Sequence, residues 1–185
     1  GMLAEADALL AGLPPSPESC CLRGEILAHM GAAAEARRSR EAALEFYERM
    51  TAEDATRAPA ELFVAFGRAL VGLNRFEEAN EVMLAQALEQ GRENPDVLRF
   101  GAELFASKYD FPEARKYLRR ALTAAPENPD ALALMARTLL DDPGAGPNRL
   151  AEAKSHVERA LAVNTSHEQA LIMRGDACYF DGGYE

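Results

Sequence analysis

One pattern recurs along most of this 185-residue chain at an interval of about 34 residues. Each copy has a helical stretch with apolar residues three and four apart, then a polar turn, then a second such stretch. The clearest copy runs from Pro95 to Asn128, with its turn at residues 108–110 and Pro126 ending its second helix. Its apolar positions are Leu98, Ala102 and Phe105, followed by Ala114, Leu118, Ala121 and Leu122. A fixed period predicts a stack of similar helical pairs, each burying its apolar face against its neighbours.

The same register can be followed in both directions from this copy. It predicts complete repeats at about 17–50, 60–94, 95–128 and 129–167, a lone N-terminal helix at 2–16, and at 168–185 the first helix of a further, incomplete repeat. The repeat at 129–167 has a longer turn, residues 142–147, whose Pro and Gly residues predict a loop. The repeat at 17–50 is less regular, because Arg23 and Arg40 occupy positions that are normally apolar. Near Gln86 we expect the second helix to shift register or lengthen.

Composition favours helices throughout. The hydrophobic fraction of 48% is ample for a core. Ala and Leu dominate it, while β-branched and aromatic residues are scarce, which favours helix over strand. We therefore expect an all-α protein in which the repeats form one solenoid over residues 1–185.

Helix–turn–helix units of about 34 residues, with a large–small–large first helix and regularly spaced Ala in the second, resemble the tetratricopeptide repeat (TPR) family. The best match is the stretch from Phe100-Gly101-Ala102 to Pro126 and the repeat after it. The resemblance covers residues 17–185 and implies a right-handed superhelical α-solenoid. We expect the small residues Gly67, Ala102, Ala136 and Gly175 to allow close helix approach, and the large residues Phe63, Leu98, Leu132 and Leu171 to fill the spaces between layers.

In this family the first helices line a concave groove, which implies a set of ligand-facing positions here. The expected binding residues are Val64, Arg68, Val71, Arg99, Glu103, Arg137, Leu140, Ile172, Asp176 and Tyr179, accompanied by Cys21, Glu25, Ala28, Ala106 and Ala133. Two interpretations stay open. Either an extended peptide lies in the groove with its acidic groups on the arginines, or the arginines pair with neighbouring acids and keep the face soluble. The positions matching the family's carboxylate clamp for chaperone tails carry other residues, so that function is not expected.

Charge narrows the choice of partner. The formal net charge of −10 argues against nucleic acid and anionic membrane surfaces and favours basic or apolar ligands. No run of about 18 apolar residues occurs, so we expect nothing to span a bilayer, and with the acidic charge we expect no direct membrane contact from this segment. Gly1-Met2 resembles a tag remnant and carries no signal-peptide pattern. We therefore expect a cytoplasmic protein, or a periplasmic or anchored one if a leader or anchor belongs to a longer parent chain.

The residues that carry chemistry are scattered. Cys20, Cys21 and Cys178 have no metal-ligand spacing, and we expect small buried side chains in a reducing compartment. His29, His156 and His167 lie in different units, and surface or capping positions are expected for them. Residues 144–146 lack the Lys-Ser/Thr of a phosphate loop. We therefore expect no enzyme activity, no metal and no cofactor.

Three functions remain open. The first is a non-catalytic scaffold that binds a protein or peptide. The second is a self-association module, as in bacterial secretion, envelope or pilus machines, motivated by the lone helix from Glu168, which would expose Leu171 and Cys178. Such a module could form a homo-oligomer through this helix. The third is a regulatory segment of a larger enzyme.

Overall fold

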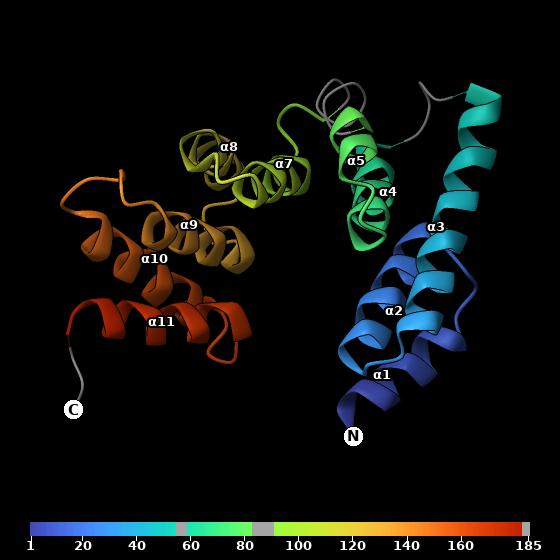
Figure 1. Cartoon of the computed structure of the whole chain (residues 1–185), viewed down its shortest axis with the longest axis horizontal. Helices are drawn as coiled ribbons and strands as arrows, with labels where there is room; N and C mark the ends of the chain where they lie inside the picture. Colours follow the sequence, from blue (N-terminus) through green and yellow to red (C-terminus); the bar gives the residue numbers. More distant parts are fainter. Residues whose placement is uncertain (55–58, 83–90, 183–185) are drawn as a thin grey trace. The chain divides into compact units, whose positions relative to one another are not determined.

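The computed structural model describes residues 1–54, 59–82 and 91–182, and every regular element within these ranges is an α-helix (Figure 1). The chain forms two compact units, residues 1–92 and 93–185. The prediction that all repeats form one continuous solenoid stays a prediction. So does the register change expected near Gln86, which lies outside the described residues. None of the helices within these ranges is long and apolar enough to cross a membrane.

Unit 1 begins with three helices, α1 (Met2–Ala11), α2 (Pro17–His29) and α3 (Ala33–Asp54). They are followed by α4 (Ala60–Gly72) and α5 (Phe76–Val82). Helix α2 packs on α1, α3 and α4, and α4 packs in turn on α5. The pair α4/α5 lies within the repeat predicted at 60–94 and α2 within the one predicted at 17–50, whereas α3 continues to Asp54, past the predicted end of its repeat. Helix α1 is the expected lone N-terminal helix.

Local chemistry sets where α2 begins and ends. The Ser16 hydroxyl accepts from the Ser19 N–H, the Ser19 hydroxyl accepts from the Ser16 N–H, and Pro17 occupies the first helical position. This reciprocal pair satisfies N–H groups that the helix cannot pair internally. After α2, Gly31 takes a φ of 78°, a left-handed conformation that allows the chain to turn into α3.

The two arginines that broke the apolar pattern in unit 1 are both accommodated. Arg23 forms an ion pair of 2.7 Å with Asp7 and so joins α2 to α1. Arg40 runs past Gly24 and Gly72, and its guanidinium donates to the Gly72 carbonyl at 2.9 Å. A Cβ atom at position 72 would lie 2.3 Å from the Arg40 Nε, so a larger residue there would require the end of the Arg40 side chain to move. The Arg40 stem therefore fills space that an apolar residue would fill in a regular repeat.

Unit 2 contains two complete helix pairs and one further helix. The pairs are α7 (Pro95–Ser107) with α8 (Phe111–Ala124), and α9 (Pro129–Asp141) with α10 (Arg149–Val163), followed by α11 (Glu168–Phe180). Each helix packs on the next along the chain, and α9 also packs on both α7 and α11. The first helices of three successive repeats therefore lie in series, as the sequence predicts for residues 95–180.

The core of unit 2 combines small and large side chains in the expected register. Ala102 and Ala136 are fully buried and allow the helices to approach closely. Leu98 and Leu132 are fully buried as well and fill the space between helices, as does Phe63 in unit 1. The regular spacing of these positions explains why the repeat was readable from sequence.

The end of unit 2 departs from this pattern. A Cβ atom on Gly175 would meet no atom of the described chain within 4 Å, and this glycine is exposed. Leu171 is 38% exposed, and Cys178 is exposed as well. The repeat register was therefore wrong in placing Gly175 and Leu171 between layers, and the general expectation of buried cysteines was wrong for Cys178. The exposure of Leu171 and Cys178 expected for a lone terminal helix is observed. The physical reason is that no described helix packs on this side of α11.

The loop between α9 and α10 is held by a buried arginine. Arg115 of α8 is 9% exposed and donates to the Thr138 carbonyl at 3.1 Å. Its second nitrogen pairs with the Asp142 carboxylate at 2.7 Å, while Arg149 donates to the Asp142 carbonyl at 2.8 Å. These contacts attach the extended turn, which the sequence predicts as a loop, to the neighbouring helix pair.

Candidate binding surfaces

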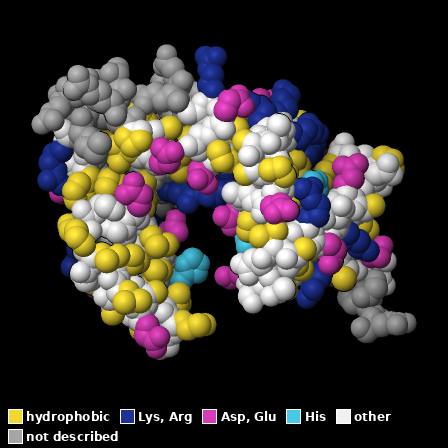
Figure 2. Space-filling view, turned by 180° about the vertical axis from the view of Figure 1, so that it is seen from behind, with side chains coloured by type: hydrophobic (Ala, Val, Ile, Leu, Met, Phe, Trp, Pro, Cys, Tyr) yellow, Lys and Arg dark blue, Asp and Glu magenta, His cyan; other side chains and the backbone are white. Residues whose placement is uncertain are grey.

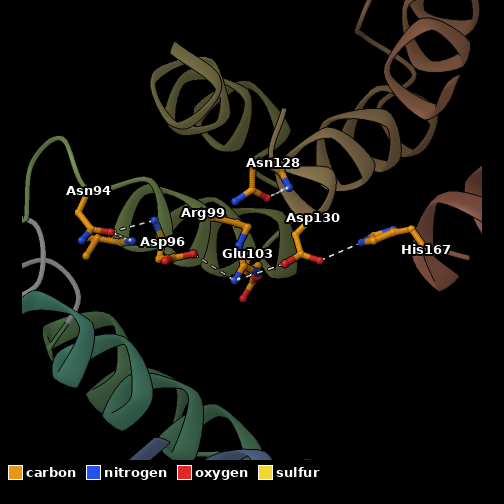
Figure 3. A network of polar contacts seen from close by, with 9 residues as sticks. Asn94, Asp96, Arg99, Glu103, Asn128, Asp130 and His167 are labelled. Carbon is orange, nitrogen blue, oxygen red and sulfur yellow. Dashed lines mark hydrogen bonds and ion pairs between the residues drawn. The ribbon is translucent and has the colours of Figure 1, made fainter. Parts of the chain in front are cut away.

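A chain of polar contacts links the first helices of unit 2 (Figure 3). It starts on α7 with Asp96, Arg99 and Glu103, passes to Asp130 in the first turn of α9, and ends at His167, which caps α11. The exposed groove residues predicted on α9 and α11 are Arg137, Ile172, Asp176 and Tyr179. Together with the residues of this network, they make up the first-helix surface of unit 2.

Arg99 is the centre of this network. Its side chain is only 13% exposed and forms an ion pair with Glu103, one turn further along α7. It lies 3.7 Å from Asp96 and 3.9 Å from Asp130. Three carboxylates therefore surround one guanidinium. This arrangement favours the second interpretation given above, in which the arginines pair with neighbouring acidic residues. Because three carboxylates surround one guanidinium, the net charge around Arg99 is negative.

His167 has its protonation pattern fixed by geometry. Its Nδ1 accepts from the Ala170 backbone N–H at 3.2 Å, so this nitrogen carries no proton. Its Nε2 lies 2.9 Å from the Asp130 carboxylate and therefore carries the proton that it donates. His167 is thus a capping histidine, as expected, and it also ties α11 to the start of α9.

The ten predicted binding residues divide by exposure. Val64 and Leu140 are only 7% and 5% exposed and pack in the cores of their units, so their assignment to an open groove was wrong. The half-buried residues are Arg68, Val71, Arg99 and Glu103, and the exposed ones are Arg137, Ile172, Asp176 and Tyr179. The structure brings Arg99 and Glu103 together, whereas Arg137 pairs with Asp141 at 3.4 Å. Whether these residues bind a ligand stays a prediction.

Sequence reasoning missed Asp96, Asp130 and the link from Asp130 to His167. The available signal was the triplet Asn-Pro-Asp at 94–96 and again at 128–130. Asn94 and Asn128 cap α7 and α9 by accepting backbone N–H bonds, and Pro follows each at the first helical position. The Asp after each Pro then lies in the first turn, where the helix dipole favours a negative charge.

The residues that the structure describes line an open cavity in each unit. In unit 1, a cavity of about 450 Å³ lies between α1, α2 and α3, where Leu10, Leu13 and Leu27 meet Ser19, Arg23 and Arg38. In unit 2, a cavity of about 350 Å³ lies between α8, α9 and α10. It is lined by residues outside the first-helix surface, among them Arg119, Met135 and His156.

The cysteines of unit 1 are unreactive by environment. The Cys21 thiol donates to the Ala65 carbonyl at 2.9 Å, and burial raises its pKa to about 12. Burial also raises the pKa of Cys20. Both are buried, as expected. Within 1–54, 59–82 and 91–182, no group of three or more His, Cys, Asp or Glu residues is placed to hold a metal ion.

His156 is not a surface or capping residue, and that expectation was wrong. It is half-buried on α10, and its Nδ1 is buried without a hydrogen-bond partner among the residues that the structure describes. Burial, and secondarily the charge of Arg159, lower the pKa of His156. The ring is therefore neutral near pH 7.

No protein-family model matches the sequence, and no curated protein matches it. Solved structures do match. A tetratricopeptide repeat protein from Parabacteroides merdae superposes with a TM-score of 0.60 at 19% sequence identity. The match covers 91% of this chain and 61% of the Parabacteroides protein, so this chain spans less than two thirds of that protein's length. The thermophilic TPR protein TTC0263 from Thermus thermophilus gives 0.65 at 16% identity, over 96% and 89%. YrrB, described as a TPR protein with an unusual peptide-binding site, gives 0.50 at 18% identity, over 90% and 87%.

Proposed function

We propose that this protein, which has the helical-repeat fold of TPR proteins, is a scaffold that binds an extended segment of another protein along the first-helix surface of unit 2. The observation that carries the proposal is that three successive first helices, α7, α9 and α11, are tied in series by Arg99, Asp130 and His167. A rigid row of helices can present evenly spaced side chains to an extended chain. The peptide-binding description of YrrB, a structural neighbour, supports a ligand of this class.

The charges of this surface favour a basic ligand. Asp96, Glu103 and Asp130 surround the single guanidinium of Arg99, and Asp141 pairs with Arg137. Asp176 adds an exposed carboxylate on α11. Exposed Ile172 and Tyr179 offer apolar contact beside it. We therefore propose a segment with Lys or Arg side chains and apolar residues between them, in place of the acidic ligand that the arginines alone suggested.

An array of extended peptides, basic in one set and acidic in the other, tests this proposal. Basic peptides are expected to bind, and Asp176→Lys is expected to weaken them by about tenfold, which corresponds to about 1.4 kcal/mol. Glu158→Lys is the matched control, because it makes the same charge change at an exposed site on α10. Equal loss in both variants, or a preference for acidic peptides, would contradict a basic ligand on this surface.

A second candidate is self-association through α11. The apolar side chains Leu171, Ile172, Tyr179 and Phe180 are all at least 38% exposed on this one helix. Apolar side chains gathered on one helix can form an interface between copies. Light scattering over a range of protein concentration tests it: a monomer at every concentration argues against this function, and a dimer lost in Ile172→Ser supports it.

A further inference from the structure

The cavity of unit 2 is built from one face of each of three helices. Helix α8 contributes Arg115 and Arg119, which are four residues apart, and α10 contributes Glu152 and His156, which have the same spacing. Side chains with this spacing lie on one side of a helix. Met135 and Leu139 of α9, also four apart, supply apolar lining. The cavity is therefore bordered by charged helices on two sides and has an apolar wall between them.

The lining of this cavity carries more positive than negative charge. Arg115 is neutralised by Asp142 at 2.7 Å. Arg159 donates to the Pro126 carbonyl at 2.8 Å, which is an uncharged acceptor. Arg119 forms no ion pair with any residue that the structure describes. Glu152 is the one carboxylate of the lining, so two guanidinium groups face one acid. The lining is positive although the chain as a whole has a formal net charge of −10.

His156 adds an imidazole ring to this lining. Its Nδ1 is buried and has no partner among the described residues, so one polar atom of the ring is left unsatisfied. The cavity then offers two guanidinium groups and one imidazole ring beside an apolar wall. Lys and Arg side chains also lie on the face of unit 2 that Figure 2 shows.

We propose that this cavity binds a carboxylate attached to an apolar group, with the carboxylate on Arg119, Arg159 and His156 and the apolar part against Met135 and Leu139. Guanidinium groups bind carboxylates through paired, charge-assisted hydrogen bonds. The apolar wall distinguishes such a ligand from a simple inorganic anion. The site lies on residues other than those of the first-helix surface, so it is independent of the proposed peptide binding.

Hexanoate is a suitable probe, and the imidazole C–H signals of the protein report on it. The chain has three histidines, and comparison with His156→Gln assigns the signal of His156. Hexanoate is expected to shift this signal saturably and to raise the pH of its titration midpoint, because a bound anion favours the imidazolium. Acetate lacks the apolar part and hexanol lacks the charge, and each is expected to bind at least about fivefold more weakly.

Paired variants give the structural control. Arg119→Gln is expected to weaken hexanoate binding by about tenfold, whereas Arg120→Gln should leave it unchanged. Arg120 is the next residue and equally charged, but it pairs with Glu93 and does not line the cavity. The absence of a saturable shift, or equal effects of the two variants, would overturn the proposal.

The source of the carboxylate is distinguished by a short peptide. Acetyl-Ala-Leu with a free C-terminus is compared with hexanoate and with its own C-terminal amide. Tighter binding of the free acid than of hexanoate identifies a peptide C-terminus, and the reverse identifies a small-molecule acid. Binding of the amide as tight as that of the acid would contradict a carboxylate site.

Discussion

Tyr109 has a backbone conformation that its side chain does not favour. Its φ is 62°, and the residue is 81% exposed. Gly31, Asn74 and Gly182 take similar left-handed angles at the same place in their repeats, the turn after the first helix. Glycine adopts this conformation without a steric penalty, and asparagine tolerates it. Tyr109 is therefore the strained member of the series.

Tyr109→Gly is expected to stabilise the protein. Relief of a left-handed residue is worth about 1–2 kcal/mol, and the extra backbone entropy of glycine costs about 0.5–1 kcal/mol. The net gain in the free energy of unfolding should be about 0–1.5 kcal/mol, measured by urea denaturation. Tyr109→Ala is the control, because it also removes the ring contact with Phe111 but keeps a Cβ atom. Equal stability of the two variants would show that the turn is not strained.

His156 makes stability depend on pH in a defined direction. Because its pKa is lowered in the folded state, the unfolded chain binds the proton more readily. Its contribution to stability is therefore present above the unfolded pKa of about 6.5 and is lost as pH falls below it. Urea denaturation between pH 7.5 and pH 5.5 should show a loss in the wild type that is smaller in His156→Gln. If the free energy of unfolding changes equally with pH in the wild type and in His156→Gln, other groups cause the pH dependence.

At the scale of helices, the buried ion pair of Arg115 and Asp142 is the contact most sensitive to change. Although burial alone would raise its pKa, hydrogen bonds from Arg115 and the Gly144 N–H hold the pKa of Asp142 below its usual value. Removing Arg115 also leaves the Thr138 carbonyl without this donor. A half-buried carboxylate without its partner is costly.

Arg115→Ala should lower the free energy of unfolding by about 2–4 kcal/mol. Arg120→Ala, which removes an exposed pair with Glu93, should cost about 0–1 kcal/mol. Thermal denaturation followed by circular dichroism compares the two. If the substitutions cost the same, the Arg115 pair is not a structural anchor for the loop between α9 and α10.

Helix positions were largely predictable because local residues determine them. Pro17, Pro95 and Pro129 each occupy the first position of a helix, next to a Ser or Asn cap. The Arg99–Glu103 pair follows from a spacing of four residues. The Asp130 contacts were not predictable, because they depend on how α9 packs on α7 and α11. Val64 and Leu140 were misplaced for the same reason: repeat register assigns a face, but packing decides whether the side chain is exposed.

At the scale of the whole molecule, the division into two compact units has a consequence for folding. Residues 93–185 contain their own continuous core, in which side chains of α7, α8, α9, α10 and α11 pack together. The first and last helices of this unit are held by local contacts. Asn94 caps α7, and His167 both caps α11 and bonds to Asp130. Repeat arrays of this kind take their stability from each unit and its nearest neighbours.

A fragment of residues 93–185 is therefore expected to fold without residues 1–92. Circular dichroism should show helix with a single cooperative transition, and amide NMR signals should be well dispersed. In this fragment, Leu132→Ala removes a fully buried side chain and should cost about 2–5 kcal/mol, whereas Leu171→Ala changes a partly exposed one and should cost less. A fragment without cooperative unfolding would show that the core of unit 2 depends on the rest of the chain. Equal effects of the two substitutions would contradict the placement of Leu132 inside this core and of Leu171 at its edge.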